Sequence, residues 1–201
     1  MDFLRFLSRK LNILACPGCS VGDGGGINDL CEDCRRKILF FGDHCCCSCG
    51  GELDGVLACC SKCMKEDKRP YLEAVSVFAY QSFGRKIILD FKSHSMLPYA
   101  RIFGNMAAER VRYACPHWDF DMIVPVPLPW SRKFSRTYNQ SELFSLFMAK
   151  ELGVPLVRNV LVRTKRTRSQ KFLSGSERHK NLHDAFRAVR SLVDGRSVLL
   201  T

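Results

Sequence analysis

The sequence predicts an α/β protein that carries a separate cysteine-rich module at its N-terminal end. Eleven of the twelve cysteines lie between residues 16 and 63. Beyond them, short apolar segments typical of buried strands alternate with amphipathic segments typical of helices. Apolar residues make up 46% of the chain and charged residues 25%, a balance that supports a core and excludes wholesale disorder. Two domains are therefore expected, residues 1–66 and 70–201, with the charged stretch before Pro70 as their boundary.

The first fourteen residues are expected to form a short packing helix. Five apolar side chains fit one helix face, namely Phe3, Leu4, Leu7, Leu11 and Leu14. Basic residues at positions 5, 9 and 10 interrupt this apolar run, so an export signal or membrane-surface segment is the weaker alternative. No apolar run approaches the length of a transmembrane segment. The sequence therefore predicts a cytoplasmic protein.

The cysteines of the N-terminal module form four Cys-x-x-Cys pairs: Cys16/Cys19, Cys31/Cys34, Cys46/Cys49 and Cys60/Cys63. Disulfides are not expected, because the cytosol keeps thiols reduced. A two-residue gap lets one turn point both thiolates at a metal, and two such turns complete a tetrahedral site. The spacers 20–30 and 50–59 suit a zinc ribbon. One or two four-cysteine zinc sites are predicted, with an iron–sulfur cluster or redox thiols as the alternatives.

The register of the second pair of motifs is ambiguous, because cysteines are adjacent at 45–47 and at 59–60. Cys46 and Cys60 are chosen because both give the two-residue gap. Cys115 stands alone and is expected to be a structural thiol. The loop 20–30 holds no basic or aromatic residue, which argues against direct reading of bases. A metal-stabilised structural or docking module is the plainer interpretation.

The second predicted domain begins with an alternating strand over 74–80, followed by helices over 84–92 and 98–112. Asp119 and Asp121 introduce MIVPVP, whose continuous apolar character indicates a buried strand of a parallel sheet. Pro125 and Pro127 end this strand, and the polar, basic loop LPWSRKFSRTYNQ follows. The order of elements up to this point is that of an α/β domain.

The remaining elements continue this alternation. Residues 139–152 read as an amphipathic helix capped by Gly153. A strand is expected over 154–162, then a long basic stretch, then a third parallel strand over 197–200. Strand–helix–strand order with buried apolar strands predicts a parallel sheet with right-handed crossovers.

Ligands of such sheets bind outside the carboxyl ends of the strands. The loop after Val126 holds Arg132, Lys133 and Arg136, and a second basic segment follows Val162. Residues 158–190 contain ten Lys or Arg against two Asp or Glu, in a chain of net charge +11. Because the guanidinium fork matches phosphate, these ends predict a site for an anionic, phosphate-bearing ligand. The alternative is a solvated charged loop with no ligand.

Together these segments resemble the ComF family of competence-associated proteins. IVPVPL at 123–128 resembles the family's Val-Pro-Val-Pro-Leu strand, and Arg132 with 136–140 resembles its Arg…Arg-Gly-Phe-Asn-Gln motif. The run of Gln170, 173–174, 177–178, Asn181 and 185–186 resembles its Gln…Leu-Ser…Glu-Arg…Asn…Ala-Phe pattern. The four cysteine pairs resemble its ribbons, and Lys92 falls where its hood segment carries a lysine.

The resemblance implies a double zinc ribbon followed by a type I phosphoribosyltransferase-like parallel sheet with flanking helices. It implies a part in DNA uptake and natural transformation, a phosphoribosyl-diphosphate-type ligand with Mg²⁺ when the protein is full length, and a DNA-uptake helicase-type partner. No catalytic residue is predicted. The substrate-binding residues implied by the resemblance and the basic loops are Lys92, Arg132, Lys133, Arg136, Asn139, Gln140, Arg163, Gln170, Arg178 and Asn181.

The sequence departs from the phosphoribosyltransferase-like pattern at its end. There, the strand matching SVLLT runs into a loop with two adjacent acidic residues and a Thr-Thr-Gly turn, which binds the ribose and the 5-phosphate. The sequence stops before the first acid. The expectation is a truncated fragment, with a shortened working protein as the alternative, and enzyme activity is left open. Two other functions stay open: an inactive fragment with a zinc-stabilised docking module, and a basic component that binds single-stranded DNA.

Overall fold

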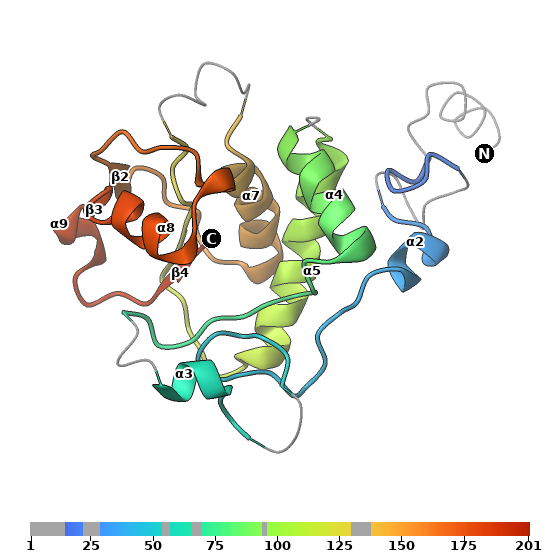
Figure 1. Cartoon of the computed structure of the whole chain (residues 1–201), viewed down its shortest axis with the longest axis horizontal. Coiled ribbons are helices and arrows are strands. Elements are labelled where there is room, and N and C mark those ends of the chain that lie inside the picture. The colour runs from blue at the N-terminus through green and yellow to red at the C-terminus, as the bar shows by residue number, and fades with distance from the viewer. Residues whose placement is uncertain (1–14, 22–28, 54–56, 66–69, 94–95, 130–137) are drawn as a thin grey trace. The chain divides into compact units, whose positions relative to one another are not determined.

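The computed structural model describes residues 15–21, 29–53, 57–65, 70–93, 96–129 and 138–201 (Figure 1). The chain forms two compact units, Met1–Pro116 and His117–Thr201. The helix expected over residues 1–14 lies outside the described residues. The compact units divide after Pro116 and not in the charged stretch before Pro70; the predicted domains 1–66 and 70–201 stay a prediction.

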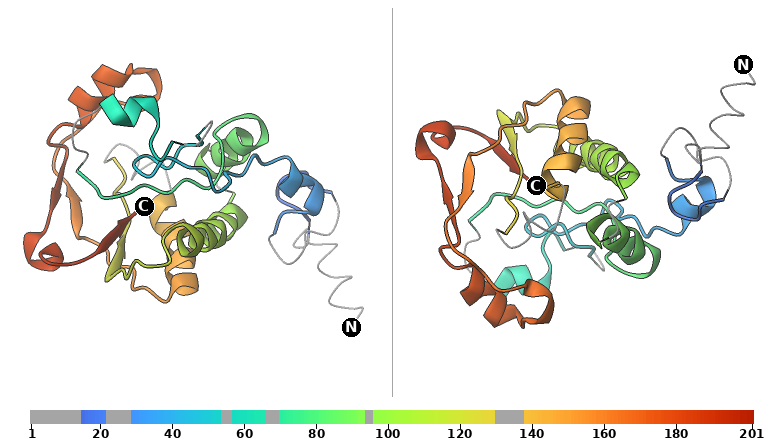
Figure 2. Two further views of the ribbon diagram at one scale, coloured as in Figure 1. Left: turned by 90° about the horizontal axis from the view of Figure 1, so that it is seen from below. Right: turned by 90° about the horizontal axis from the view of Figure 1, so that it is seen from above.

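Four helices are described in the first unit: α2 (Glu32–Arg36), α3 (Ser61–Lys65), α4 (Ser82–Ser93) and α5 (Pro98–Ala114). The last two confirm the helices predicted over 84–92 and 98–112, and they pack against each other (Figure 2). Pro98 stands in the first turn of α5, where its missing N–H has no helical partner to lose. None of the described helices has both the length and the apolar character needed to cross a bilayer.

The core of the first unit is aromatic. The ring of Phe103 on α5 lies 5.5 Å from the ring centroids of Tyr99 and Phe91, and 6.0 Å from that of Phe78. Tyr99 is completely buried, and its hydroxyl donates a hydrogen bond to the carbonyl oxygen of Pro17, at 2.8 Å. Helix α5 therefore contacts the first cysteine turn directly, which explains why residues 70–116 share a unit with the cysteine-rich segment.

The strand predicted over 74–80 is wrong as a regular strand. Phe78 forms one antiparallel bridge, with Phe40, which consists of two backbone hydrogen bonds: Phe41 N–H to Val77 and Ala79 N–H to Leu39. The alternating apolar pattern still has a structural role, because it places the ring of Phe78 against Phe103 in the aromatic core. The pairing is limited to this bridge and does not continue into a ladder.

The described elements of the second unit are β1 (Met122–Val124), α7 (Gln140–Leu152), β2 (Leu161–Arg163), η1 (Gln170–Phe172), α8 (Gly175–Leu182), β3 (Phe186–Ala188), α9 (Arg190–Val193) and β4 (Val198–Leu200). Strands β1 and β4 pair in parallel, with Ile123 opposite Leu199. On its other side β1 forms a parallel bridge between Ile123 and Leu156. All three residues of β1 are buried, as a central strand requires. The predicted α/β class with a parallel sheet is confirmed.

The single strand predicted over 154–162 is wrong. Leu156 pairs with β1, but Asn159 adopts a left-handed conformation, with φ of 63°, and turns the chain away. The following strand β2 instead pairs antiparallel with β3. Val157, Val160 and Leu161 lie on both sides of this turn and pack on the same small core. The apolar pattern in the sequence is therefore continuous and does not reveal where the strand breaks.

The helix predicted over 139–152 is confirmed as α7. The side chain of Asn139 caps it by accepting a hydrogen bond from the backbone N–H of Ser141, and Gly153 ends it with φ of 71°. The amide nitrogen Nδ2 of Asn139 donates to the carbonyl oxygen of Val126, at 3.1 Å. Helix α7 therefore begins beside the carboxyl end of β1.

Candidate metal centres and basic module

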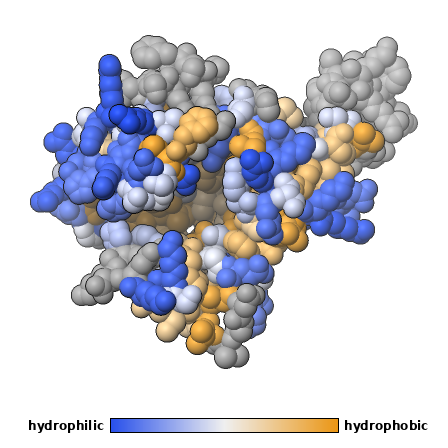
Figure 3. Space-filling view, viewed as in Figure 1, coloured by the Kyte–Doolittle hydropathy of each residue, from blue (hydrophilic) through white to orange (hydrophobic). Residues whose placement is uncertain are grey.

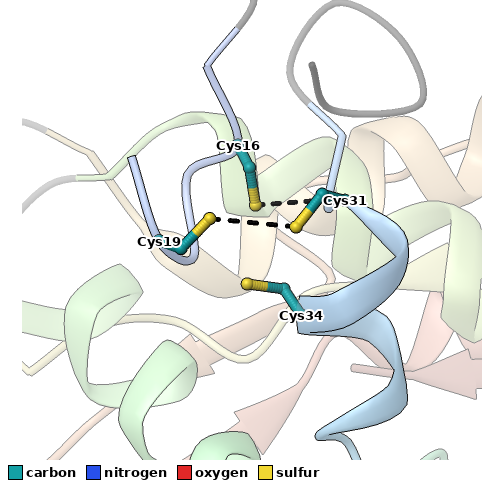
Figure 4. Close-up of side chains that lie close together, drawn as sticks. All are labelled: Cys16, Cys19, Cys31 and Cys34. Carbon is teal, nitrogen blue, oxygen red and sulfur yellow. Dashed lines mark hydrogen bonds between the residues drawn. The ribbon is translucent and has the colours of Figure 1, made fainter. Parts of the chain in front are cut away.

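The structure brings the eight predicted cysteines together in two groups. The first group contains Cys16, Cys19, Cys31 and Cys34, and the second contains Cys46, Cys49, Cys60 and Cys63; within each, all sulfur atoms lie within 4.8 Å of one another. Figure 4 shows the four side chains of the first group converging from two segments of chain. In the second group the register is the predicted one, since Cys45, Cys47 and Cys59 lie outside the set.

The two groups are built in the same way. In each, a tight turn joins the first two cysteines, and a five-residue helix follows the third cysteine and carries the fourth: α2 in the first group and α3 in the second. Each turn ends in a left-handed residue, Ser20 with φ of 58° or Gly50 with φ of 66°. The N–H groups of these residues donate to the carbonyl oxygens of Cys16 and Cys46, at 2.7 and 2.8 Å.

Backbone N–H groups in these turns point at sulfur atoms. The Sγ atom of Cys16 accepts from Gly18 and Cys31 at 3.3 and 3.2 Å, and that of Cys46 accepts from Cys60 at 3.3 Å. Burial opposes ionisation of both thiols, but the N–H donors outweigh it. They lower the pKa of Cys16 to about 7 and that of Cys46 to about 6.

The fourth cysteine of each group behaves in the opposite way. Desolvation by burial, followed by the neighbouring thiols, raises the pKa of Cys34 and of Cys63 well above the ordinary value. Each group thus combines one thiol that ionises readily with one that keeps its proton while no cation neutralises the cluster. Binding of a metal cation would release the remaining protons.

The donor set fits a structural zinc ion. Four thiolates that converge on one point give the closed tetrahedral coordination of structural zinc, with no position left for substrate. No oxygen or nitrogen ligand is needed to complete it, which favours a soft, thiolate-binding cation. Either group could therefore hold a metal whose role is to fix the two turns.

One disulfide forms beside the second group, between Cys47 and Cys59, with Cα atoms 5.7 Å apart. The expectation that the cysteines form no disulfide is wrong for this pair. Cys47 follows the first ligand and Cys59 precedes the third, so the turns that bring the ligands together bring these neighbours together as well. Their adjacency to Cys46 and Cys60 appears in the sequence only as a register ambiguity, so the sequence alone does not predict the pair.

The lone Cys115 is buried at the end of α5, and its thiol contacts the carboxylate of Glu73, at 3.7 Å from Oε2. Burial, followed by the charge of Glu73, raises its pKa. It therefore stays protonated as a structural thiol.

The predicted substrate-binding residues fall into three sets. Arg132, Lys133 and Arg136 lie outside the described residues. Lys92 is exposed on α4, in the first unit. The others lie in the second unit: Asn139 and Gln140 at the start of α7, Arg163 on β2, Gln170 on η1, and Arg178 and Asn181 on α8.

Two of these residues tie the basic segment together. The carboxamide of Asn181 accepts from the backbone N–H of Arg168 at 3.1 Å and donates to its carbonyl oxygen at 3.0 Å. The Nε atom of Arg178 donates to the carbonyl oxygen of Gln170, at 3.2 Å. Helix α8 thus holds the preceding loop in place. We call residues 161–188 the basic module.

Arg163 and Gln170 are less exposed. The guanidinium of Arg163 lies 4.9 Å from the ring centroid of Phe186 and donates to the hydroxyl of Thr167. Desolvation by burial lowers its pKa. The carboxamide of Gln170 is buried and has no hydrogen-bond partner among the described residues. An unpaired buried polar group is costly, and a water molecule or a polar ligand could supply the missing partner.

The surface of the basic module carries exposed cations and one exposed aromatic ring. The exposed cations are Lys165, Arg166, Arg168, Arg178, Lys180 and Arg187. Phe172 on η1 is 84% exposed. Figure 3 shows the face over α8 and α9 as predominantly hydrophilic. The module thus offers phosphate-binding groups and one exposed ring that could stack on a base.

No protein-family model matches the chain. It is similar to "Competence protein F" of Haemophilus influenzae, with 29% identity over 163 residues, which cover 79% of this chain and 69% of that protein. It is also similar to "DNA utilization protein YhgH" of Escherichia coli O157:H7, with 35% identity over 80 residues, which cover 40% of this chain and 35% of that protein. These relatives, with the two four-cysteine groups, confirm the predicted resemblance to the ComF family.

Proposed function

We propose that this protein acts inside the cytoplasm in the uptake and handling of DNA during natural transformation. The similarity to competence protein F over 79% of the chain carries the proposal, and the similarity to a DNA utilization protein agrees with it. A DNA-uptake helicase-type protein is the partner that the resemblance implies. In this reading the four-cysteine groups bind zinc and hold the first unit in shape for docking.

Deleting the gene in a naturally transformable host tests this role. Transformation by added plasmid DNA should fall, whereas entry of the same plasmid by electroporation should be unchanged, because electroporation bypasses uptake. Complementation with the full chain should restore transformation. Unchanged transformation in the deletion strain would contradict the proposal.

The second unit is suited to a phosphorylated ligand of the phosphoribosyl-diphosphate type, which would bring Mg²⁺ with it. The support is placement: α7 begins beside the end of β1, and Val126 donates to the carbonyl oxygen of Thr201 at 2.8 Å, so β1 and β4 end together. The carboxyl ends of parallel strands are where α/β folds bind ligands. Arg132, Lys133 and Arg136, which precede α7 in the sequence, would meet the phosphates. Asn139 would instead fix the start of α7 beside β1, because its side chain caps the helix and donates to Val126, and Gln140 is buried. Isothermal titration calorimetry with the Mg²⁺ salt of phosphoribosyl diphosphate tests this binding, and inorganic diphosphate serves as the comparison ligand.

The basic module favours a second function, binding of single-stranded DNA. Phe172 lies between Arg168 and Arg178 along the chain, and both arginines are held by the hydrogen bonds of α8. Phosphates would pair with the cations while a base stacks on the ring, as in sequence-independent single-strand binding. The module is fixed rather than a loose charged loop, which is what a binding surface needs.

Fluorescence anisotropy with a labelled oligothymidine, titrated with salt, measures this binding. Affinity should fall steeply with salt, and Phe172→Ala should weaken it by about 1–3 kcal/mol. Leu72→Ala is the matched control. It also removes a highly exposed apolar side chain, since Leu72 is 88% exposed, but Leu72 belongs to the first unit and lies outside the basic module. Absence of binding at low salt would contradict this function and favour a docking module.

A further inference from the structure

The Cys47–Cys59 pair has no counterpart in the first four-cysteine group. Because the two groups share one architecture, the corresponding positions can be compared: the residue after the first ligand and the residue before the third. They are Pro17 and Leu30 in the first group, but Cys47 and Cys59 in the second. The same scaffold therefore brings two additional thiols together in one group alone, among the residues that the structure describes.

The backbone places these two cysteines opposite each other. The N–H of Cys47 donates to the carbonyl oxygen of Ala58, at 2.9 Å, and the two Cα atoms lie 5.7 Å apart, within the usual range for a disulfide. Cys47 is exposed and Cys59 is half-buried, whereas the adjacent ligand Cys46 is buried. Cys47 is therefore open to reagents from solvent while the ligand next to it is shielded; Cys60, the ligand next to Cys59, is half-buried like Cys59 itself.

The third additional thiol of this segment is directed elsewhere. The Sγ atom of Cys45 accepts a hydrogen bond from Nη2 of Arg110, at 3.2 Å, and donates to the carbonyl oxygen of Gly42, at 3.4 Å. Arg110 also binds that carbonyl oxygen, at 2.8 Å. Cys45 is thus held on the α5 side, and Cys47 and Cys59 are left to react with each other.

We propose that Cys47 and Cys59 form a reversible dithiol–disulfide pair, separate from the metal ligands, which clasps the two halves of the second four-cysteine group when oxidised. The co-reactant is a small disulfide such as oxidised glutathione. One thiolate attacks it, forming a mixed disulfide and releasing one reduced thiol; the second thiolate then displaces the other. The S–S bond forms, the reagent's S–S bond breaks, and its two sulfurs leave as thiols that carry the two protons.

The Cys47–Cys59 disulfide should slow the release of metal from the second four-cysteine group. The first pair of ligands lies on one turn and the second pair on another, and the metal holds both. When coordination opens, the disulfide keeps the two turns within reach, so that re-formation of the site competes with escape of the metal. The second group should therefore lose zinc more slowly when the pair is oxidised, whereas the first group should not respond.

The first experiment identifies the pair. The zinc-loaded full chain is incubated with oxidised glutathione, alkylated with N-ethylmaleimide and analysed by intact mass and peptide mapping. The expected product has lost two hydrogen atoms, retains its zinc and contains a single crosslinked peptide joining Cys47 to Cys59. A stable glutathione adduct on Cys45, or a disulfide that involves Cys46 or Cys60, would overturn the proposal.

The second experiment measures zinc release to a chromogenic chelator, with and without a phosphine reductant. Oxidation should slow the release from one of the two groups at least about tenfold. The double variant Cys47→Ser/Cys59→Ser should bind the same amount of zinc but lose the response to oxidation. Cys45→Ser, next to the pair in sequence, is the matched control and should keep the response. Identical release from oxidised and reduced wild type, or faster release on oxidation, would overturn the proposal.

Discussion

At the scale of single residues, the turns of the two cysteine groups place the same demand on the backbone and meet it with different residues. Both turns end in a left-handed conformation, in Ser20 and Gly50. A Cβ atom on Gly50 would lie 2.4 Å from the carbonyl oxygen of Ala74 and 2.9 Å from the backbone nitrogen of Ser76. Gly50 is therefore required twice over, by its φ angle and by the backbone packed against it.

Gly50→Ala should destabilise the zinc-loaded protein by at least about 2 kcal/mol, because left-handed strain and a clash with backbone add together. Ser20→Gly is the matched control at the equivalent position; it relieves left-handed strain and should change stability by less than about 1 kcal/mol. Urea denaturation monitored by circular dichroism measures both. Equal effects of the two variants would contradict the role of the Ala74 contact.

The register of the second group gives a sharper test, because a ligand and a non-ligand are adjacent in sequence. Cys46→Ser should remove one of the two expected zinc equivalents, since it leaves three sulfurs in the group. Cys45→Ser should leave the zinc content unchanged, because the Cys45 thiol contacts Arg110 and Gly42 instead. Atomic emission on the purified variants measures the metal. Loss of zinc from the Cys45 variant alone would show that the register is shifted.

At the scale of elements, the basic module depends on helix α8, which is short and has no buried residue. Ser174 and Glu177 form a capping box at its start: the Ser174 hydroxyl accepts from the Glu177 N–H, and the Glu177 carboxylate accepts from the Ser174 N–H at 2.7 Å. The Ser174 side chain, and then its backbone N–H, lower the pKa of Glu177 below the ordinary value of 4.5. The ties from Asn181 and Arg178 to the preceding loop require that this helix forms.

Ser174→Ala should destabilise α8 by about 1 kcal/mol, as loss of an N-cap does. It should also return the pKa of Glu177 towards its ordinary value. Because the folded pKa is lowered, the contribution of Glu177 is present above the ordinary pKa and is lost as the pH falls through the folded value. Carboxylate NMR titration of the full chain measures the pKa. An unchanged Glu177 pKa in this variant would contradict the capping box.

The elements that the sequence predicts well are those whose signals are local. Helices α4, α5 and α7 follow from periodicity, Pro98 and Gly153, and β1 and β4 follow from short apolar runs between turn residues. The turn at Asn159 and the single bridge of Phe78 depend on the partner segments, which no local pattern contains. The cysteine spacing likewise predicts the two groups, whereas the Cys47–Cys59 pair requires knowledge of how the two turns face each other.

At the scale of the whole molecule, the metal groups and helices α4 and α5 belong to one compact unit. Gly18, in the first cysteine turn, has so little space that an added Cβ would lie 2.8 Å from the ring of Phe83 on α4. Tyr99 on α5 binds the carbonyl oxygen of Pro17 in the same turn. If zinc fixes this turn, the two helices should depend on the metal although they lie beyond the predicted domain boundary.

Removing zinc with a chelator should therefore increase amide hydrogen exchange in α4 and α5 as well as in the cysteine turns, and leave exchange in α7 unchanged. Tyr99→Phe removes the hydrogen bond to Pro17 but keeps the ring, so exchange in the first cysteine turn should rise in the zinc-loaded variant. Phe147→Leu, a larger change to an aromatic side chain on α7 in the second unit, is the control and should leave that turn unaffected. If α4 and α5 keep their protection after chelation, then the cysteine module is independent of them and the boundary before Pro70 separates two domains. If they lose it together with the turns, zinc stabilises the whole of residues 1–116, and any partner that docks on α4 or α5 will sense the metal state of the cysteine groups.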